Sequence, residues 1–210
     1  TGLQWFCIHP DLKYNDIARW LYDAFYELNI ECDILSADDT DLFGQYKILV
    51  TPALYSASDT LVDSLRRFVT EGGHLISTFK TAFSDPVLKI YPDDQPHKLT
   101  DVFGMTYDQF TDGVNVGLKD CAFEIDSLKN TVRFWMELLL PDTARTLAAY
   151  DHPQWGSFAA VTENSFGNGK AIYIGCYFNS GLLKNLLSYA VKDAGLTLPA
   201  EQYPVIIKRG

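Results

Sequence analysis

Clusters of basic residues are absent from this sequence, and their absence excludes two kinds of partner. No cluster of Lys or Arg is longer than a pair such as Arg66-Arg67, and the formal net charge is -10. A negatively charged chain is repelled by the phosphate backbone of nucleic acids and by anionic membrane surfaces. No apolar run is long enough to span a membrane, and no stretch has the pattern of a signal peptide. We therefore expect neither nucleic acid nor a membrane as a partner.

Metal-binding motifs are missing as well. The four cysteines are widely separated and form no CxxC pair: Cys7, Cys32, Cys121 and Cys176. The four histidines show neither HxxxH nor HxH spacing. Because zinc sites are usually built from such local pairs, we predict no metal site. Isolated cysteines in apolar runs are typical of a reduced protein, so we expect a cytoplasmic location.

A glycine-rich loop that could cradle a phosphate is also missing. The turn after the first predicted strand reads His9-Pro-Asp-Leu-Lys13, and Pro10 removes a backbone donor from it. Gly72-Gly73 precedes a predicted strand instead of a helix, so we interpret this pair as a helix terminator. These features disfavour a nucleotide or a flavin, and we expect no cofactor.

The stretch from Tyr46 to Phe79 contains the clearest pattern in the chain. Lys47 to Thr51 is a short apolar run rich in β-branched residues, which is typical of a strand buried on both faces. Ser56 and Asp59 have the spacing of a capping box and precede an apolar stripe at helical spacing. The stripe consists of Leu61, Val62, Leu65, Phe68 and Val69. His74 to Phe79 then predicts a second, parallel strand reached by a right-handed crossover, so the unit is βαβ.

The preceding residues show the same alternation of strand and helix. Leu3 to Ile8 predicts a buried strand, Asn15 or Asp16 caps a helix with one apolar face, and Cys32 to Leu35 predicts the next strand. Strands that alternate with helices are the signature of an open, doubly wound parallel sheet.

The second half predicts a short helix, several short strands and one long helix. Leu99 to Phe103 predicts the short helix, and Ser165 to Gly169 predicts the turn of a β-hairpin. The predicted strands cover residues 105–110, 115–118, 122–125, 130–140, 146–150, 158–163 and 170–175. Asn179 or Ser180 caps the long helix, and Val205 to Lys208 predicts a final strand. We expect a three-layer α/β fold with a mainly parallel, doubly wound sheet and a late β-hairpin.

Cys176 is the one residue whose position suggests a nucleophile. It follows a predicted strand and precedes a helix, where a nucleophile elbow is found in other α/β proteins. No base or cation lies near it in the sequence, however, and a catalytic thiol needs both. We interpret Cys176 as a buried structural thiol.

Seven stretches, taken in order, resemble a known family. They are Tyr46-Lys-Ile-Leu-Val-Thr-Pro52, Leu65-Arg-Arg-Phe-Val69, Glu71-Gly-Gly73, Leu99-Thr-Asp-Val-Phe-Gly104, Ala160-Val-Thr-Glu-Asn164, Gly167 to Gly175 and Val205-Ile-Ile-Lys-Arg209. The chain is similar along nearly its whole length to the middle, trimerisation domain of family 42 glycoside hydrolases, which are β-galactosidases. The resemblance implies a flavodoxin-like fold similar to that of class I glutamine amidotransferases. Where amidotransferases carry their cysteine, this chain reads Thr78-Phe-Lys-Thr81, so that nucleophile is absent.

The resemblance also implies how this chain relates to a complete enzyme. The family's two catalytic glutamates belong to a preceding (β/α)₈ barrel, and the Asn-Glu pair that contains the acid/base occurs nowhere in this sequence. We therefore assign no catalytic residue and expect residues 1–210 to be one non-catalytic trimerisation domain. Because the chain begins at Thr1-Gly2 without a methionine, we expect it to be excised from a longer, retaining β-galactosidase. A galactoside would bind only through the absent barrel.

Aromatic residues in loops are the candidates for a trimer interface. Tyr55, Phe83, Tyr91, Tyr107 and Trp155 fall in loops or at strand edges, where a monomer would expose them. As an alternative, the long loop from Lys80 to Lys98 folds Phe83 and Tyr91 back onto its own domain.

A second function stays open at this point. It is a free-standing amidotransferase-like enzyme or a small-molecule-binding domain. Such a protein would use Cys176 or a pocket under the Lys80 to Lys98 loop, since folds of this class bind ligands at the carboxyl edge of the sheet.

Overall fold

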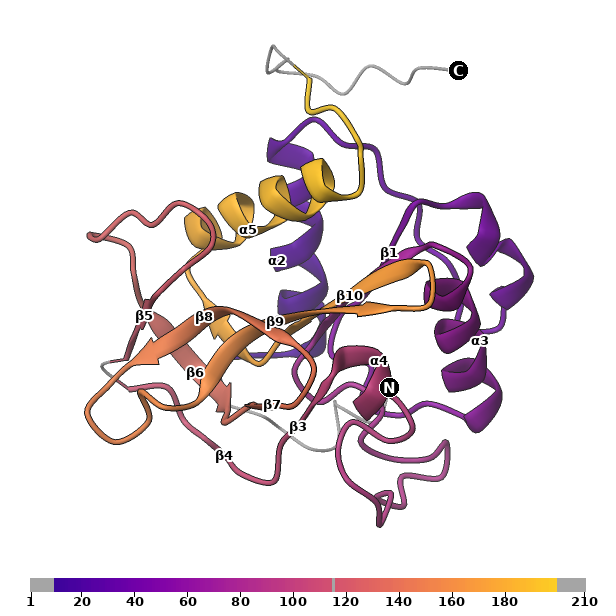
Figure 1. The fold of residues 1–210 in the computed structure, drawn as a ribbon, viewed down its shortest axis with the longest axis horizontal. Coiled ribbons are helices and arrows are strands. Elements are labelled where there is room, and N and C mark those ends of the chain that lie inside the picture. Colours follow the sequence, from indigo (N-terminus) through magenta and orange to yellow (C-terminus); the bar gives the residue numbers. More distant parts are fainter. Residues whose placement is uncertain (1–9, 115, 200–210) are drawn as a thin grey trace.

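A six-stranded mixed sheet organises the computed structural model, which describes residues 10–114 and 116–199 (Figure 1). The strands, in their order across the sheet, are β1 (Ile48–Thr51), β2 (His74–Thr78), β10 (Gly169–Ile174), β9 (Ala159–Phe166), β8 (Arg145–Asp151) and β5 (Gly117–Lys119). A second sheet has the order β11 (Cys176–Phe178), β6 (Val132–Glu137) and β4 (Phe110–Thr111), and a third pairs β3 (Met105–Thr106) with β7 (Leu140–Pro141). The helices are α2 (Tyr14–Glu27), the 3₁₀ helix η1 (Thr40–Gln45), α3 (Asp59–Thr70), α4 (Thr100–Phe103) and α5 (Ser180–Asp193).

The large sheet combines parallel and antiparallel pairs. β1 and β10 both run parallel to β2, whereas β9 pairs antiparallel with β10 and β8 pairs antiparallel with β9 and β5. The described part of the sheet is therefore mixed, whereas the sequence predicted a mainly parallel sheet. The difference arises in the second half, where strands such as β9 and β10 follow one another through a tight turn instead of a crossover helix.

Two apolar clusters form the core, one on each side of the large sheet. Alternate side chains along β2 and β10 enter different clusters: Leu75 and Tyr173 pack with α3 and α4, while Ile76 and Ile174 pack with α2 and α5. The predicted stripe on α3 is buried, and the burial of a side chain such as Leu65 stabilises the fold by about 2 kcal/mol. The positions of α3 and β2 confirm the predicted βαβ unit.

Asn179 caps α5 as predicted, accepting a hydrogen bond from the Gly181 N–H (2.8 Å), but the caps of α3 and α2 differ from the prediction. Ser58 caps α3, and its hydroxyl accepts a hydrogen bond from the Leu61 N–H (3.2 Å). Ser56, the predicted cap, instead donates its hydroxyl to the Asp85 carbonyl (2.8 Å). Ser58 takes the role because its backbone is extended directly before the first helical residue, as a cap requires. Similarly, α2 begins after Lys13, whose N–H donates to the Asp16 carboxylate (2.9 Å).

Two predicted strands are wrong. Residues 32–35 and 122–125 belong to no strand, and Ile34 is 90% exposed. A strand requires a ladder of hydrogen bonds to a neighbour. The Ala122 N–H donates to the Leu147 carbonyl of β8 (2.8 Å), but this single bond forms no ladder, and residues 32–35 pair with no described strand. The strands predicted at Leu3 to Ile8 and at Val205 to Lys208 lie outside the described residues. Within the described part of the chain, no helix is both long and apolar enough to cross a membrane.

Candidate functional site at the carboxyl edge of β1 and β2

The chain leaves the parallel strands β1 and β2 through unusual backbone conformations. Ala53 follows β1 with φ +38°, and Lys80 and Ala82 follow β2 with φ +60° and +53°. Residues other than glycine reach this left-handed region at a cost of about 1 kcal/mol each. Hydrogen bonds hold the turns in place, since Thr78 Oγ1 accepts from the Ala53 N–H (2.7 Å) and Thr81 donates its hydroxyl to the Thr78 carbonyl (2.7 Å). The carboxyl edge of the two strands is therefore a fixed elbow.

Lys80 points its charged end into aromatic rings at this elbow. Its side chain is only 4% exposed, and Nζ lies 3.6 Å from the ring centre of Phe83, 3.5 Å from that of Phe110 and 4.9 Å from that of Trp135. An ammonium over an aromatic face is attracted by about 1 to 2 kcal/mol when water is excluded. The rings thus replace part of the hydration that burial removes from Lys80.

Glu137 lies directly behind the elbow at the end of β6. Its carboxylate accepts hydrogen bonds from the Lys80 N–H (2.9 Å), the Tyr173 hydroxyl (2.8 Å) and Trp135 Nε1 (3.4 Å). Complete burial raises the pKa of Glu137, and the Lys80 charge and these donors oppose the rise. Burial likewise lowers the pKa of Lys80, and the Glu137 charge opposes that change. The site holds a buried amine and a buried carboxyl group whose pKa values shift toward each other.

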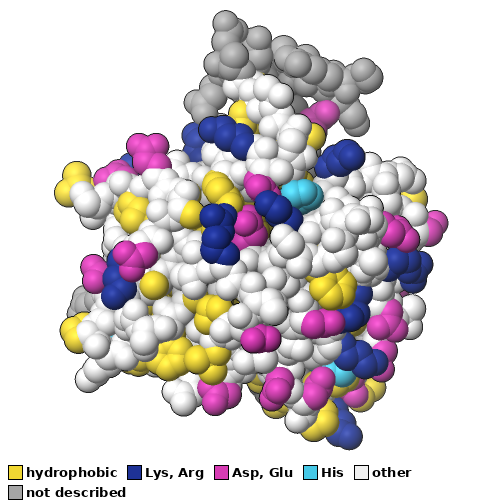
Figure 2. All heavy atoms as spheres, viewed as in Figure 1, with side chains coloured by type: hydrophobic (Ala, Val, Ile, Leu, Met, Phe, Trp, Pro, Cys, Tyr) yellow, Lys and Arg dark blue, Asp and Glu magenta, His cyan; other side chains and the backbone are white. Residues whose placement is uncertain are grey.

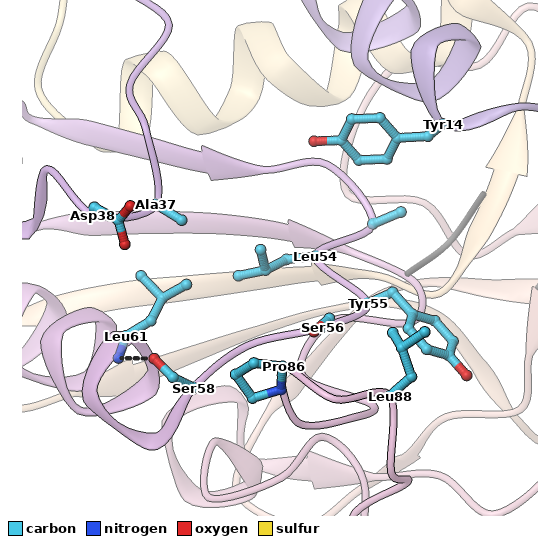
Figure 3. Close-up of a pocket in the computed structure, with 11 residues that line it drawn as sticks. Tyr14, Ala37, Asp38, Leu54, Tyr55, Ser56, Ser58, Leu61, Pro86 and Leu88 are labelled. Atoms are coloured by element: carbon cyan, nitrogen blue, oxygen red, sulfur yellow. Dashed lines mark hydrogen bonds between the residues drawn. The ribbon is translucent and has the colours of Figure 1, made fainter. Parts of the chain in front are cut away.

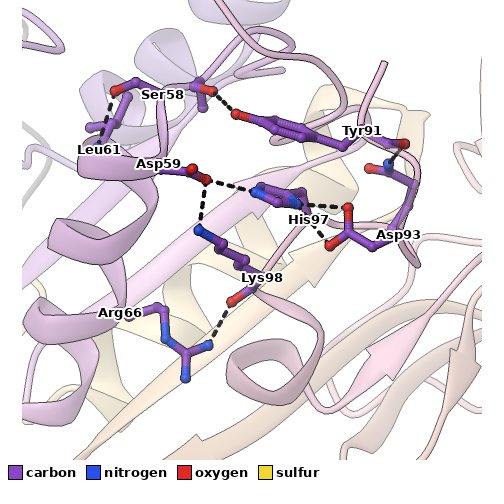
Figure 4. Close-up of polar contacts among 10 residues, drawn as sticks. Ser58, Asp59, Leu61, Arg66, Tyr91, Asp93, His97 and Lys98 are labelled. Carbon is purple, nitrogen blue, oxygen red and sulfur yellow. Dashed lines mark hydrogen bonds and ion pairs between the residues drawn. The ribbon is translucent and has the colours of Figure 1, made fainter. Parts of the chain in front are cut away.

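The long loop after the elbow is fastened to α3. His97 contacts the Asp93 carboxylate through Nδ1 (2.7 Å) and the Asp59 carboxylate through Nε2 (2.8 Å), as Figure 4 shows. Lys98 Nζ lies 2.9 Å from the same Asp59 carboxylate. Tyr91 stacks on the His97 ring with centroids 3.5 Å apart, and its hydroxyl donates to a backbone carbonyl just before α3 (2.9 Å). The hydrogen bond from His97, followed by that from Lys98, lowers the pKa of Asp59.

A pocket of about 460 Å³ lies between β1 and this loop (Figure 3). Leu54, Tyr55 and Ser56 supply one wall, and Pro86 and Leu88 from the loop supply another. Its only charged lining residue is Asp38, among the described residues. The walls supply apolar contacts together with the hydroxyl groups of Tyr14, Ser56 and Ser58.

Cys176 is the first residue of strand β11, and it pairs with Met136 of β6, the neighbour of Glu137 in the chain. The Cys176 side chain is 0% exposed, and burial raises the pKa of its thiol well above the usual range. A nucleophilic thiol requires the opposite setting, partly exposed and electropositive. The structure therefore supports the prediction of a structural thiol and gives Cys176 none of the features of a nucleophile.

The loop aromatics divide into two groups. Tyr55 and Tyr107 are 4% and 3% exposed, so the expectation that a monomer would expose them is wrong. Tyr55 packs on Phe83 (ring centroids 5.4 Å apart) because the chain turns inward after β1. Phe83, Tyr91 and Trp155 are partly buried. For Phe83 and Tyr91 the alternative is correct, since both fold back onto their own domain.

Sequence reasoning missed the pairing of Lys80 with Glu137. A signal was present, because Glu137 is the one charged residue in the apolar run Phe134 to Leu140, and a carboxylate in such a run must find donors inside the protein. The partner could not be found this way, since it lies 57 residues earlier in the chain. Among the described residues, no group of three or more His, Cys, Asp or Glu side chains could hold a metal ion.

The described part of the chain is thus a mixed α/β fold with a buried lysine at a strained elbow and a buried cysteine. Comparison with protein families places residues 4–197 in the family described as the β-galactosidase trimerisation domain. Because the match covers most of the chain, the chain belongs to this family.

Individual relatives are larger than this chain. β-Galactosidase Bga of Halorubrum lacusprofundi is 32% identical over 212 residues, which cover 96% of this chain and 30% of that protein. β-Galactosidase LacA of Lactobacillus acidophilus is 30% identical over 189 residues, or 90% of this chain and 28% of that protein. The crystal structure of β-galactosidase from Bacillus circulans sp. alkalophilus superposes with a TM-score of 0.81 at 21% identity, covering 90% of this chain and 28% of that one. The chain thus spans less than a third of these relatives.

Proposed function

We propose that this chain is the non-catalytic oligomerisation domain of a cytoplasmic β-galactosidase and that it assembles as a trimer. The observation that carries the proposal is the family match over residues 4–197. The elbow supports it, because the stretch Thr78-Phe-Lys-Thr81, where the resemblance would place the cysteine of an amidotransferase, contains no cysteine, and Cys176 is buried. The proposed domain is a single one, with the three-layer fold of class I glutamine amidotransferases.

In this proposal the complete protein hydrolyses terminal β-D-galactosides. The relatives with the printed name β-galactosidase support this activity. A retaining glycosidase needs two carboxyl groups about 5 Å apart on either side of the scissile bond. The pocket beside β1 has only one lining carboxylate, that of Asp38, among the described residues. As the family resemblance implies, the proposal places the two catalytic carboxylates in a barrel outside this chain, and the purified chain should not cleave a chromogenic β-galactoside above background.

The surface we propose for assembly is the face of the loop from Lys80 to Lys98. Val87 and Ile90 on this loop are 82% and 50% exposed, and Phe83 and Tyr91 lie partly buried beneath it. Trp155, also partly buried, is a candidate for the second surface, because a closed three-fold ring joins two different faces. Exposed aliphatic side chains beside half-buried aromatic rings are typical of an interface that closes on association.

Sedimentation velocity tests the assembly. The chain should associate at high protein concentration, and Ile90→Asp should weaken association at least tenfold because it places a charge in the apolar contact. The matched control is Leu128→Asp in another loop, where the side chain is 93% exposed, and it should leave association unchanged. A monomer under every condition, or equal effects of the two substitutions, would contradict the proposed surface.

The amidotransferase-like alternative is not favoured. It requires an activated nucleophile, and the Cys176 thiol is fully buried with a raised pKa. Glutamine hydrolysis that disappears in Cys176→Ser would overturn this judgement.

A further inference from the structure

The amine of Lys80 is the buried reactive group that the proposed function does not use. We propose that Lys80 is a covalent binding site for aldehydes. Its amine condenses with small aldehydes, including the open-chain form of a reducing sugar, to give an imine. The residue lies at the carboxyl edge of β2 on a turn with φ +60°, the kind of strained elbow that presents a nucleophile in other α/β proteins.

The surroundings of the amine distinguish it from other lysines of the chain. Lys98 and Lys170 are held as ammonium ions by carboxylates at 2.9 and 2.7 Å. Among the described residues, no acceptor forms a hydrogen bond with Lys80 Nζ, which contacts the faces of Phe83, Phe110 and Trp135 instead. Loss of the proton therefore breaks no hydrogen bond of the side chain, and its cost is the attraction of the ammonium ion to the rings and to Glu137. Burial lowers the pKa of Lys80, so the neutral, nucleophilic form is populated near neutral pH.

Phe110 is the most exposed of the three rings around the amine. Phe110 lies 3.5 Å from Nζ, is 46% exposed and belongs to β4, a strand of two residues at the edge of its sheet. The opposite side of Nζ is closed by Phe83, which packs on Tyr55 in the core. In the proposal, the Phe110 ring rotates off its stack on Trp135 (ring centroids 4.7 Å apart) and exposes the amine to a molecule of a few carbon atoms.

The chemistry requires no further reactant. The lone pair of neutral Nζ attacks the aldehyde carbon, the C–N bond forms, and the carbonyl oxygen takes a proton to give a carbinolamine. Loss of the hydroxyl group as water and of the remaining N–H proton leaves a C=N bond, so one amine and one aldehyde give one imine and one water. Glu137 acts as a positioning residue, because its carboxylate accepts a hydrogen bond from the backbone N–H of Lys80. The negative charge of Glu137 also favours the ammonium form of the Lys80 side chain.

Reductive trapping tests the proposal. The protein is incubated with glycolaldehyde or with D-galactose in the presence of cyanoborohydride between pH 6 and 9, and labelled lysines are quantified by peptide mass spectrometry. At pH 7 Lys80 should be labelled by glycolaldehyde roughly tenfold faster than the exposed Lys89 in the same loop. Labelling by galactose as well would identify the open-chain sugar as a ligand, and labelling by glycolaldehyde alone would restrict the site to small aldehydes; both support the proposal.

Variants separate reactivity from access. Phe110→Ala should accelerate labelling of Lys80 and leave Lys89 unchanged. Glu137→Gln should move the pH profile of Lys80 labelling to lower pH, a shift that a merely structural role of Glu137 would not produce. If Lys80 reacts no faster than Lys89 in both the original protein and Phe110→Ala, the proposal is overturned.

Discussion

Lys80 and Glu137 are two ionisable residues buried where the loss of hydration destabilises the charged form of each. Glu137 is 0% exposed and Lys80 is 4% exposed, so each loses nearly all contact with water. Ion pairs in such places contribute little net stability, but the removal of one partner leaves the other charge uncompensated. The hydrogen bonds from the Lys80 N–H and the Tyr173 hydroxyl show that the carboxylate is part of the elbow itself.

A double-mutant cycle measures this pairing. We expect Lys80→Met and Glu137→Gln each to lower the free energy of unfolding by about 3 kcal/mol, because each leaves one buried group without its partner. The double variant should lose at least about 1 kcal/mol less than the sum of the two, as residues in direct contact do. Chemical denaturation of the four proteins gives these values, and strict additivity would show that the two side chains act independently.

A second prediction concerns the reactivity of individual cysteines. Cys176 should stay unmodified by iodoacetamide in the native protein, because the thiol is buried and its pKa is raised. Cys32 is exposed, although burial of part of its side chain raises its pKa to about 11, and it should react slowly at pH 8. In denaturant the two should react alike, and mass spectrometry of the two peptides follows both rates.

At the scale of elements, the β9–β10 hairpin and helix α3 fit together through glycine. A Cβ on Gly169 would lie 2.2 Å from the Gly73 carbonyl oxygen and 2.4 Å from that of Val69, which are both backbone atoms. Gly167 has φ +58°, and a Cβ there would lie 2.6 Å from the Thr70 Cα. The turn of the hairpin therefore rests directly on the end of α3, where only glycine allows the backbones to approach.

Gly169→Ala tests this contact. The substitution should lower the free energy of unfolding by about 3 kcal/mol or more, because backbone atoms cannot move aside as flexible side chains do. The matched control is Gly44→Ala in η1, where a Cβ would meet nothing within 4 Å. That variant should be neutral or stabilising by up to about 1 kcal/mol. Thermal denaturation compares the two, and similar melting temperatures would contradict the close approach.

The attachment of the 80–98 loop to α3 should depend on pH. The folded pKa of Asp59 is lowered by His97 and Lys98, so its contribution to stability is present above the ordinary carboxyl pKa of about 4 and is lost as the pH falls through the lowered value. Pepsin should therefore cut within residues 85–96 increasingly as the pH falls from about 4 to 2. Asp93 and Tyr91 also contact His97, Lys98 contacts Asp59, and all three remain in every variant.

Asp59→Asn isolates the contribution of the carboxylate. Because it removes the charge at every pH, hydrogen exchange of the loop amides should already be fast at pH 6. Asp63→Asn, one turn further along α3, should leave this exchange unchanged. Equal protection in the two variants would show that Asp59 does not fasten the loop.

For the whole molecule, charge opposes the proposed assembly. Figure 2 shows acidic and basic side chains interspersed on one face, with no surface of basic residues alone. Each copy carries a net charge of -10, so copies repel one another until salt screens the field over a distance of about 10 Å. Association should therefore strengthen as salt rises from 0.05 to about 0.5 M. Sedimentation at several salt concentrations measures this, and weaker association at high salt would indicate that ion pairs, not apolar contacts, join the copies.

The sequence by itself determined the elements whose patterns are local. The sequence predicted the apolar stripe on α3, the glycines that end this helix and the apolar runs of β1 and β2. These patterns are local, because the periods of 3.6 and 2 residues follow directly from backbone geometry. The burial of Cys176 could be predicted as well, since the residue directly follows an apolar run. The family followed from the order of several such stretches, and the comparison over residues 4–197 confirmed it.

Tertiary structure alone decided which distant residues meet. The sheet is mixed, although the sequence predicted a mainly parallel one, because the pairing of strands is decided by tertiary structure. For the same reason residues 32–35 have no partner strand among the described residues. Folding also brought Glu137 to Lys80 across 57 residues and fastened His97 to Asp59 across 38. Such contacts carry no sequence period, because they arise from the packing of elements that are each specified separately. The buried amine at the elbow is therefore visible only in the folded chain.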